Sequence, residues 1–88
     1  MLQQEYLIIN RLGLHARASA LFVKTASQFG SEIKLARETV EVNGKSIMGI
    51  MMLAAAKGTT VRLTIEGADE VVALTTLGDL INNGFGEE

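Results

Sequence analysis

The sequence contains no cysteine, no proline and no tryptophan, and only one of its 88 residues is a histidine. The lack of cysteine excludes disulfides, thiolate nucleophiles and Cys-type zinc sites. A single histidine among scattered carboxylates also makes a poor transition-metal site, so we expect neither a metal ion nor another cofactor. No apolar run approaches the roughly 20 residues that span a bilayer, so we expect no membrane insertion.

An excess of one charge is also missing, because 8 basic and 10 acidic residues leave a net charge of −2. This balance excludes a nucleic-acid-binding protein that works through a basic face. The opening MLQQEYLIIN has no basic segment followed by a long apolar run, so we expect no signal peptide and a cytoplasmic protein. The length and the 48% hydrophobic content suit one domain, which we place at residues 1–88.

Hydrophobic periodicity predicts the order β-α-β-β-α-β-α. Alternating or β-branched residues predict strands, at 5–9, 33–37, 40–42 and 60–66. Apolar residues spaced by three and four predict helices, at 16–29, at 47–57 and from 69 onward. Clean alternation in the last strand indicates an antiparallel sheet that is covered on one side. We therefore predict an α+β fold, an open-faced β-sandwich with a four-stranded antiparallel sheet and three helices on one face.

Glycines mark several predicted boundaries. Gly30 and Gly58 follow the first two helices, where a C-terminal glycine is common. Gly78 lies inside the last helix and should lower its stability by about 1 kcal/mol relative to alanine. The final segment, GFGEE at 84–88, predicts a helix cap followed by a loose tail.

The segment GLHAR, residues 13–17, places the only histidine at a predicted helix start. His15 falls at or next to the N-cap, where unpaired backbone N–H groups and the helix dipole favour an anion and a neutral, nucleophilic imidazole. A phosphoryl group on His15 would meet the amides of Ala16 and Arg17 and the guanidinium of Arg17. From these residues alone, an ordinary histidine in a turn beside a solvated arginine is an open alternative.

The segment NGKS, residues 43–46, ends like a phosphate-binding P-loop, but the first glycine of that motif is replaced by Thr39. This replacement argues against a nucleotide site. Ser46 is the expected N-cap of the second helix. Because a phosphate is tolerated at a helix N-terminus, Ser46 is also a candidate regulatory phosphorylation site.

The second helix carries more apolar side chains than one buried face can hold. Some of Ile47, Met48 and Met51 should therefore remain exposed and form a partner-binding surface. Leu21, next to the predicted core residue Phe22, belongs to the same hypothesis. A wholly buried helix is the alternative.

Two segments, GLHARASALFVKTA at 13–26 and NGKSIMG at 43–49, resemble the HPr family. Its members are the histidine-containing phosphocarriers of the bacterial sugar phosphotransferase system. The resemblance, which extends from the MLQQE start to the last helix, implies the family's open-faced β-sandwich and a monomeric carrier rather than a stand-alone enzyme. It also implies three partners: enzyme I as donor, enzyme IIA proteins as acceptors, and an HPr kinase/phosphorylase in bacteria that possess one.

The resemblance also implies residue roles. His15 matches the phosphoryl acceptor, modified on Nδ1, and Arg17 matches the arginine that contacts the phosphoryl group. From the helix start itself we expect the backbone amides of Ala16, Arg17 and Ala18 to complete the phosphate site. Ser46 matches the serine that the kinase modifies. The docking surface for both transfer partners would include Ala20, Leu21, Lys24, Ile47, Met48 and Met51.

One position departs from the family pattern. Ala18 stands where the family typically has proline, and its N–H either bonds solvent or adds a donor to the phosphoryl site. We expect transfer to survive, because the chemistry does not require the proline ring.

Two other functions stay open at this point. One is the nitrogen-related branch of the family, whose carrier feeds a regulatory cascade. The other is a regulatory module that acts through protein contact on the apolar patch.

Overall fold

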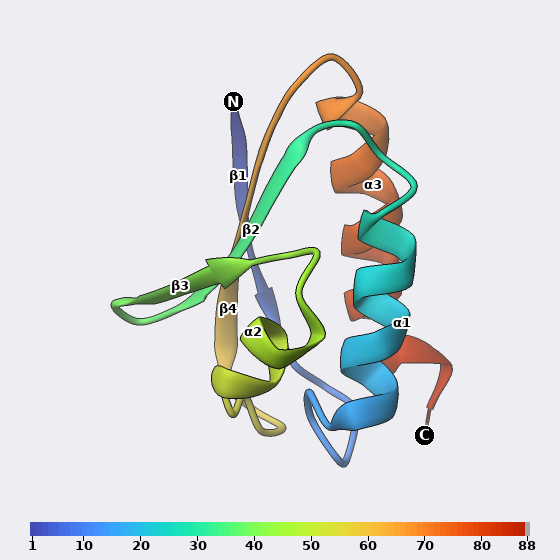
Figure 1. Ribbon diagram of the computed structural model, residues 1–88. Coiled ribbons are helices and arrows are strands. Elements are labelled where there is room, and N and C mark those ends of the chain that lie inside the picture. Colours follow the sequence, from blue (N-terminus) through green and yellow to red (C-terminus); the bar gives the residue numbers. More distant parts are fainter. Residues whose placement is uncertain (88) are drawn as a thin grey trace.

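The structure, a computed structural model, describes residues 1–87 and contains four strands and three α-helices in the predicted order (Figure 1). The strands are β1 (Leu2–Leu7), β2 (Glu32–Arg37), β3 (Val40–Asn43) and β4 (Thr60–Glu66). The helices are α1 (Ala16–Ala26), α2 (Ile47–Met52) and α3 (Glu70–Asn82), and a short 3₁₀ turn, η1 (Gly84–Gly86), follows α3. No helix in this part of the chain is long and apolar enough to cross a membrane.

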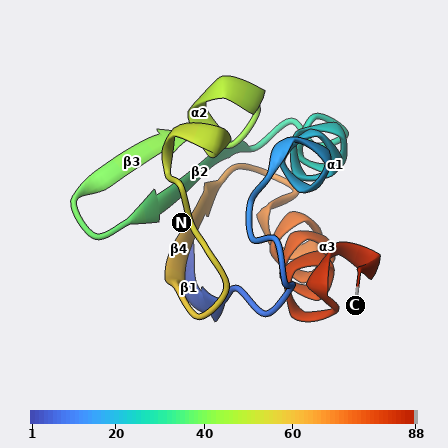
Figure 2. The same cartoon turned by 90° about the horizontal axis from the view of Figure 1, so that it is seen from below.

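The sheet has the strand order β1-β4-β2-β3, and every neighbouring pair is antiparallel. Helices α1 and α3 lie side by side on one face of this sheet, and α2 lies beside β3 (Figure 2). The opposite face carries polar side chains: in one row across the sheet, Glu5 of β1 pairs with Arg62 of β4, and Glu41 of β3 follows beyond the small residue Ala36 of β2. The predicted open-faced β-sandwich is thereby confirmed.

The core lies between the sheet and the helices and follows the two predicted periodicities. Alternate residues of the strands face inward, namely Ile33, Leu35, Val61, Leu63 and Ile65. Residues three or four apart on the helices meet them, namely Ala18, Phe22, Ala26, Ile50, Ala73, Leu77 and Ile81. Burial of each large apolar side chain contributes roughly 1.5–3 kcal/mol to folding, so these faces hold the layers together.

Gly78 has a packing reason to lie inside α3. A Cβ at this position would lie 2.9 Å from Cζ of Tyr6 and still closer to its hydroxyl oxygen. The glycine therefore makes room for the Tyr6 ring of β1, and burial of that ring raises the pKa of the Tyr6 hydroxyl above its ordinary value. Its cost in helix propensity is offset by contact between β1 and α3.

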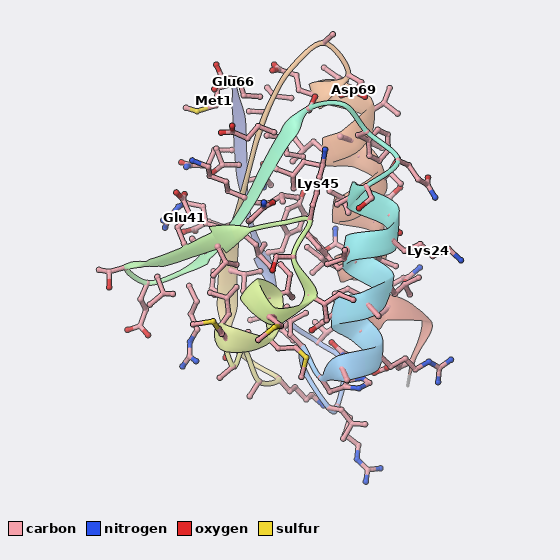
Figure 3. The ribbon with its side chains drawn as sticks, in the orientation of Figure 1. Met1, Lys24, Glu41, Lys45, Glu66 and Asp69 are labelled. Carbon is pink, nitrogen blue, oxygen red and sulfur yellow. The ribbon has the colours of Figure 1, made fainter. Side chains whose placement is uncertain are left out.

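Two predicted helices end earlier than expected. Helix α1 ends at Ala26 instead of residue 29, because Gln28 N and Phe29 N tighten to i→i−3 bonds with Thr25 O (3.1 Å) and Ala26 O (3.2 Å). Beyond this turn the chain bonds to other segments: Lys45 Nζ donates to Phe29 O (2.7 Å) and Gly30 N donates to Asp69 Oδ2 (2.9 Å). Figure 3 shows Lys45 reaching toward this end of α1. Gly30 is therefore not the glycine that caps α1.

Helix α2 ends at Met52 instead of residue 57. Arg37 Nη1 donates to the carbonyl oxygens of Leu53 (3.0 Å) and Ala54 (3.1 Å), and Ala54 adopts a left-handed φ of 49°. These tertiary bonds satisfy the carbonyl groups at the helix end and outweigh the helix propensity of the alanines that follow. Strand β1 also differs from the prediction, because it begins at Leu2 and pairs with β4 over six residues.

Candidate functional site

The loop before α1 fixes the backbone of the histidine. Gly13 has a left-handed φ of +63°, and Leu14 N donates to Ala55 O at 2.9 Å. Asn10 closes the same loop twice, because its carbonyl accepts from Gly13 N (3.1 Å) and its Nδ2 donates to Gly13 O (2.8 Å). The residue that follows Leu14, His15, is thus held at the start of α1 by the local bonds between Asn10 and Gly13 and by one backbone bond to a distant segment at Ala55.

His15 is the N-cap of α1, as the sequence predicts, with φ −74° and ψ 179°. Its carbonyl accepts from Ser19 N at 2.8 Å, but its side chain makes no capping hydrogen bond. The imidazole is therefore free to face outward, and the amides of residues 16–18 have no acceptor within the helix. Such amides form a ready position for an anion.

The imidazole lies at an open cleft of about 570 Å³ near the start of α1. The cleft is lined by Arg11, Leu12, His15, Arg17, Gly86 and Glu87. It therefore brings together His15 and Arg17, as predicted, and adds a second guanidinium, that of Arg11, which the sequence analysis did not single out. Two guanidinium groups favour an anionic group in this cleft.

Glu87 is the contact that the sequence analysis missed. Its Oε2 lies 2.6 Å from His15 Nε2, and its Oε1 accepts from Asn10 Nδ2 at 3.0 Å. The hydrogen bond from Asn10, the hydrogen bond from His15 and the charge of Arg17 hold the pKa of Glu87 below its ordinary value. The carboxylate is therefore ionised and locked beside the histidine.

The prediction of a loose tail is wrong for residues 84–87. Phe85 is buried with a left-handed φ of 59°, and Asn83 Oδ1 accepts from Gly86 N at 3.0 Å. The C-terminal end consequently lies near the start of α1 (Figure 1). One aromatic residue between two glycines was the available signal for an anchored turn, whereas Glu88 lies outside the described residues.

Ser46 is the N-cap of α2, as predicted, and its Oγ accepts from Gly49 N at 3.0 Å. Beyond it, Met48 is 76% exposed, and Ile47 and Met51 are each 43% exposed, whereas Ile50 is buried. The alternative of a wholly buried helix is therefore wrong. These three exposed residues form what we call the apolar patch of α2.

Helix α1 lies next to α2 (Figure 2). Ala20 and Lys24 are exposed and Leu21 is half-buried. Lys24 projects from α1 away from the sheet (Figure 3). Leu12 and Met52 are also exposed, and neither was singled out from the sequence.

Fold and site together define a class of small α+β proteins that present one histidine at a helix start. The family model described as "PTS HPr component phosphorylation site" matches residues 2–83. Phosphocarrier protein HPr of Neisseria meningitidis serogroup A is 61% identical over 87 residues, which cover 99% of this chain and 98% of that protein. This chain belongs to the HPr family of phosphocarrier proteins, whose members carry a phosphoryl group and are not stand-alone catalysts.

Solved structures agree with this assignment. The crystal structure of HPr-C-His from Thermoanaerobacter tengcongensis is 50% identical, covers 100% of this chain and 99% of that one, and superposes with a TM-score of 0.96. A crystal structure of an HPr dimer from the same organism is 49% identical, with coverage of 99% and 100% and a TM-score of 0.79. Chains similar to this one therefore include a dimeric form.

Proposed function

We propose that this protein carries a phosphoryl group on His15 Nδ1, which it receives from phospho-enzyme I and passes to a histidine of enzyme IIA proteins. The observation that carries this proposal is the placement of His15 at the N-cap with its side chain uncommitted to capping. A nucleophilic nitrogen there adjoins free amides and the positive end of α1.

The surroundings support a transient phosphohistidine. The amides of residues 16–18 and the guanidinium of Arg17 would receive the phosphoryl oxygens, and Arg11 lines the same cleft. Glu87 supplies negative charge next to the ring. The site thus combines donors for the phosphoryl oxygens at the helix start with a carboxylate that contacts the ring at Nε2.

The direct test is incubation with enzyme I and labelled phosphoenolpyruvate. We expect acid-labile label on the wild-type protein and none on His15→Ala, which removes the only imidazole. Lys57→Ala, an exposed position for which the structure shows no ion pair or side-chain hydrogen bond within residues 1–87, serves as the matched control. An unlabelled wild-type protein would overturn the carrier function and favour a regulatory binding module.

The docking surface in this proposal is the apolar patch of α2 together with Ala20, Leu21 and Lys24 of α1. Exposed, adaptable methionines suit a surface that meets a donor and an acceptor in turn. A phosphate on Ser46 would place nearly two negative charges at its rim, so an HPr kinase/phosphorylase could regulate docking there. We expect Ser46→Asp to raise the apparent KM for enzyme I with little loss of fold, and an unchanged KM would overturn this regulation.

The proposal places the carrier in the cytoplasm as one domain over residues 1–88 that works as a monomer. Sedimentation at working concentration tests the monomer against the dimeric form seen among similar chains. The nitrogen-related branch differs only in its partners. Transfer from the labelled protein to a IIA protein of each branch distinguishes the two.

A further inference from the structure

The C-terminal turn brings together three side chains that are far apart in the sequence. Asn10 Nδ2 donates to Glu87 Oε1 (3.0 Å), and Glu87 Oε2 lies 2.6 Å from His15 Nε2. An ionised carboxylate only accepts hydrogen bonds, so the proton of this short contact belongs to Nε2. The lone pair of the neutral imidazole then lies on Nδ1.

From this geometry we infer that Glu87 is a positioning residue for phosphoryl transfer, because it holds the proton of His15 on Nε2 and leaves Nδ1 free as the nucleophile. The inference rests on the proposed carrier function and adds the residue that selects the reacting nitrogen. A carboxylate that fixes the tautomer and orientation of a histidine has the same role in hydrolytic triads. Here it acts on a nucleophile instead of a general base.

Asn10 anchors that carboxylate to the loop that sets His15. Its side chain is buried, and its Nδ2 donates both to Gly13 O (2.8 Å) and to Glu87 Oε1. The reversed amide would turn Oδ1 toward two acceptors, so the hydrogen-bond partners fix the orientation. In this orientation Oδ1 is buried without a partner among residues 1–87, a cost that the two donated bonds offset.

The transfer step balances without movement of the Nε2 proton. The Nδ1 lone pair attacks phosphorus, the Nδ1–P bond forms, and the bond from phosphorus to the donor breaks with its electron pair on the donor. The ring, still protonated on Nε2, gains positive charge, which the Glu87 carboxylate stabilises. In the onward transfer the lone pair of a nitrogen on the acceptor histidine attacks phosphorus and forms a new N–P bond, while the Nδ1–P bond breaks and Nδ1 takes back its electron pair.

Glu87→Gln separates this role from simple anchoring of the C-terminal turn. An amide has one accepting oxygen and one donating NH₂ group, so it cannot accept from both Asn10 and His15 as the carboxylate does. A side chain that only packs would tolerate this nearly isosteric change. Glu5→Gln is the matched control, because it removes one charge from an exposed residue on the open face of the sheet.

The experiment measures single-turnover transfer from preformed phospho-enzyme I over a range of carrier concentrations up to saturation, beside ¹⁵N NMR of the imidazole. We expect Glu87→Gln to slow transfer about tenfold, the size of a lost hydrogen bond to a charged group, while the apparent KM stays unchanged. We expect the wild-type neutral ring to be protonated on Nε2 and the variant to populate both tautomers. Glu5→Gln should match the wild type in both measurements.

Each outcome has one meaning. Equal transfer rates and equal tautomers in Glu87→Gln and the wild type overturn the positioning role and leave the carrier function intact. A wild-type neutral ring without a proton on Nε2 overturns the role directly, even if the variant does not fold. A wild-type protein that phospho-enzyme I does not label overturns the proposed function itself.

Discussion

Gly13→Ala adds one methyl group at the turn that presents the histidine, and the structure allows its effect to be worked out. The new Cβ would lie 2.9 Å from Ala56 Cα and closer still to Ala55 O, and both are backbone atoms that cannot rotate away. The φ of +63° also costs alanine roughly 1–2 kcal/mol. Displacing the loop breaks the bond from Leu14 N to Ala55 O, which contributes about 1 kcal/mol.

These contributions add to about 2–3 kcal/mol, a large share of the stability of a small domain. Urea unfolding should show this loss at constant m-value, and Tm should fall by roughly 8–24 °C for a chain of this size. We also expect slower labelling from phospho-enzyme I in the folded fraction, because His15 shifts with the loop. Circular dichroism at the labelling temperature measures that fraction.

Two other glycines separate the causes. Gly58 has a φ of +91° and no atom within 4 Å of an added Cβ, so Gly58→Ala should show only the backbone strain of about 1–2 kcal/mol. Gly30 has neither feature, and Gly30→Ala should stay within about 0.5 kcal/mol of the wild type. If Gly13→Ala costs no more than Gly58→Ala, the argument from close approach to Ala55 is refuted.

Three further predictions test the packing and the electrostatics. Gly78→Ala should destabilise the wild-type protein by about 1–2 kcal/mol, because the added methyl group overpacks against Tyr6. In the Tyr6→Ala variant the same change should stabilise the protein by about 1 kcal/mol through helix propensity. If urea unfolding shows a change in the free energy of unfolding of the same sign in both proteins, this explanation is wrong. Hydrogen bonds from the Ser31 hydroxyl and then from the Gly30 N–H lower the pKa of Asp69. The ionised carboxylate therefore contributes fully to the free energy of unfolding above about pH 4, and this contribution is lost as the pH falls through the lowered pKa. Asp69→Asn should therefore be less stable than the wild type at pH 7 and equal to it near about pH 2, and a gap that persists there counts against the assignment. Ala18→Pro removes no helical hydrogen bond, so its free energy of unfolding should lie within about 1 kcal/mol of the wild type. Enzyme I-dependent labelling should also be kept, and its loss would show that the proline ring does not fit at this position.

Strand and helix faces were predictable from the sequence because their periods are local. The alternation in Thr60–Glu66 places Val61, Leu63 and Ile65 on one face of β4 whatever the strand pairs with. The N-cap positions of His15 and Ser46 were predictable for the same reason, since a cap depends on the residues within one turn of it.

The ends of helices needed the tertiary structure. Helix α2 stops at Met52 because Arg37, from β2, bonds the carbonyl groups of Leu53 and Ala54. The alanines that follow favour a helix by propensity, and nothing within that segment signals that a distant arginine competes for its end.

The complete site was likewise decided in three dimensions. His15 and Arg17 were recognisable from a helix start. The partner of His15, however, is Glu87, which lies 72 residues further along the chain. Glu87 is in turn held by Asn10, from which it is separated by 77 residues. Hydrogen bonds between such distant side chains leave no period or spacing in the sequence. They form only once tertiary packing, including burial of Phe85, brings the C-terminal turn to the start of α1. The sequence by itself thus determined which residues face inward and where the histidine stands, and the tertiary structure decided which groups surround it.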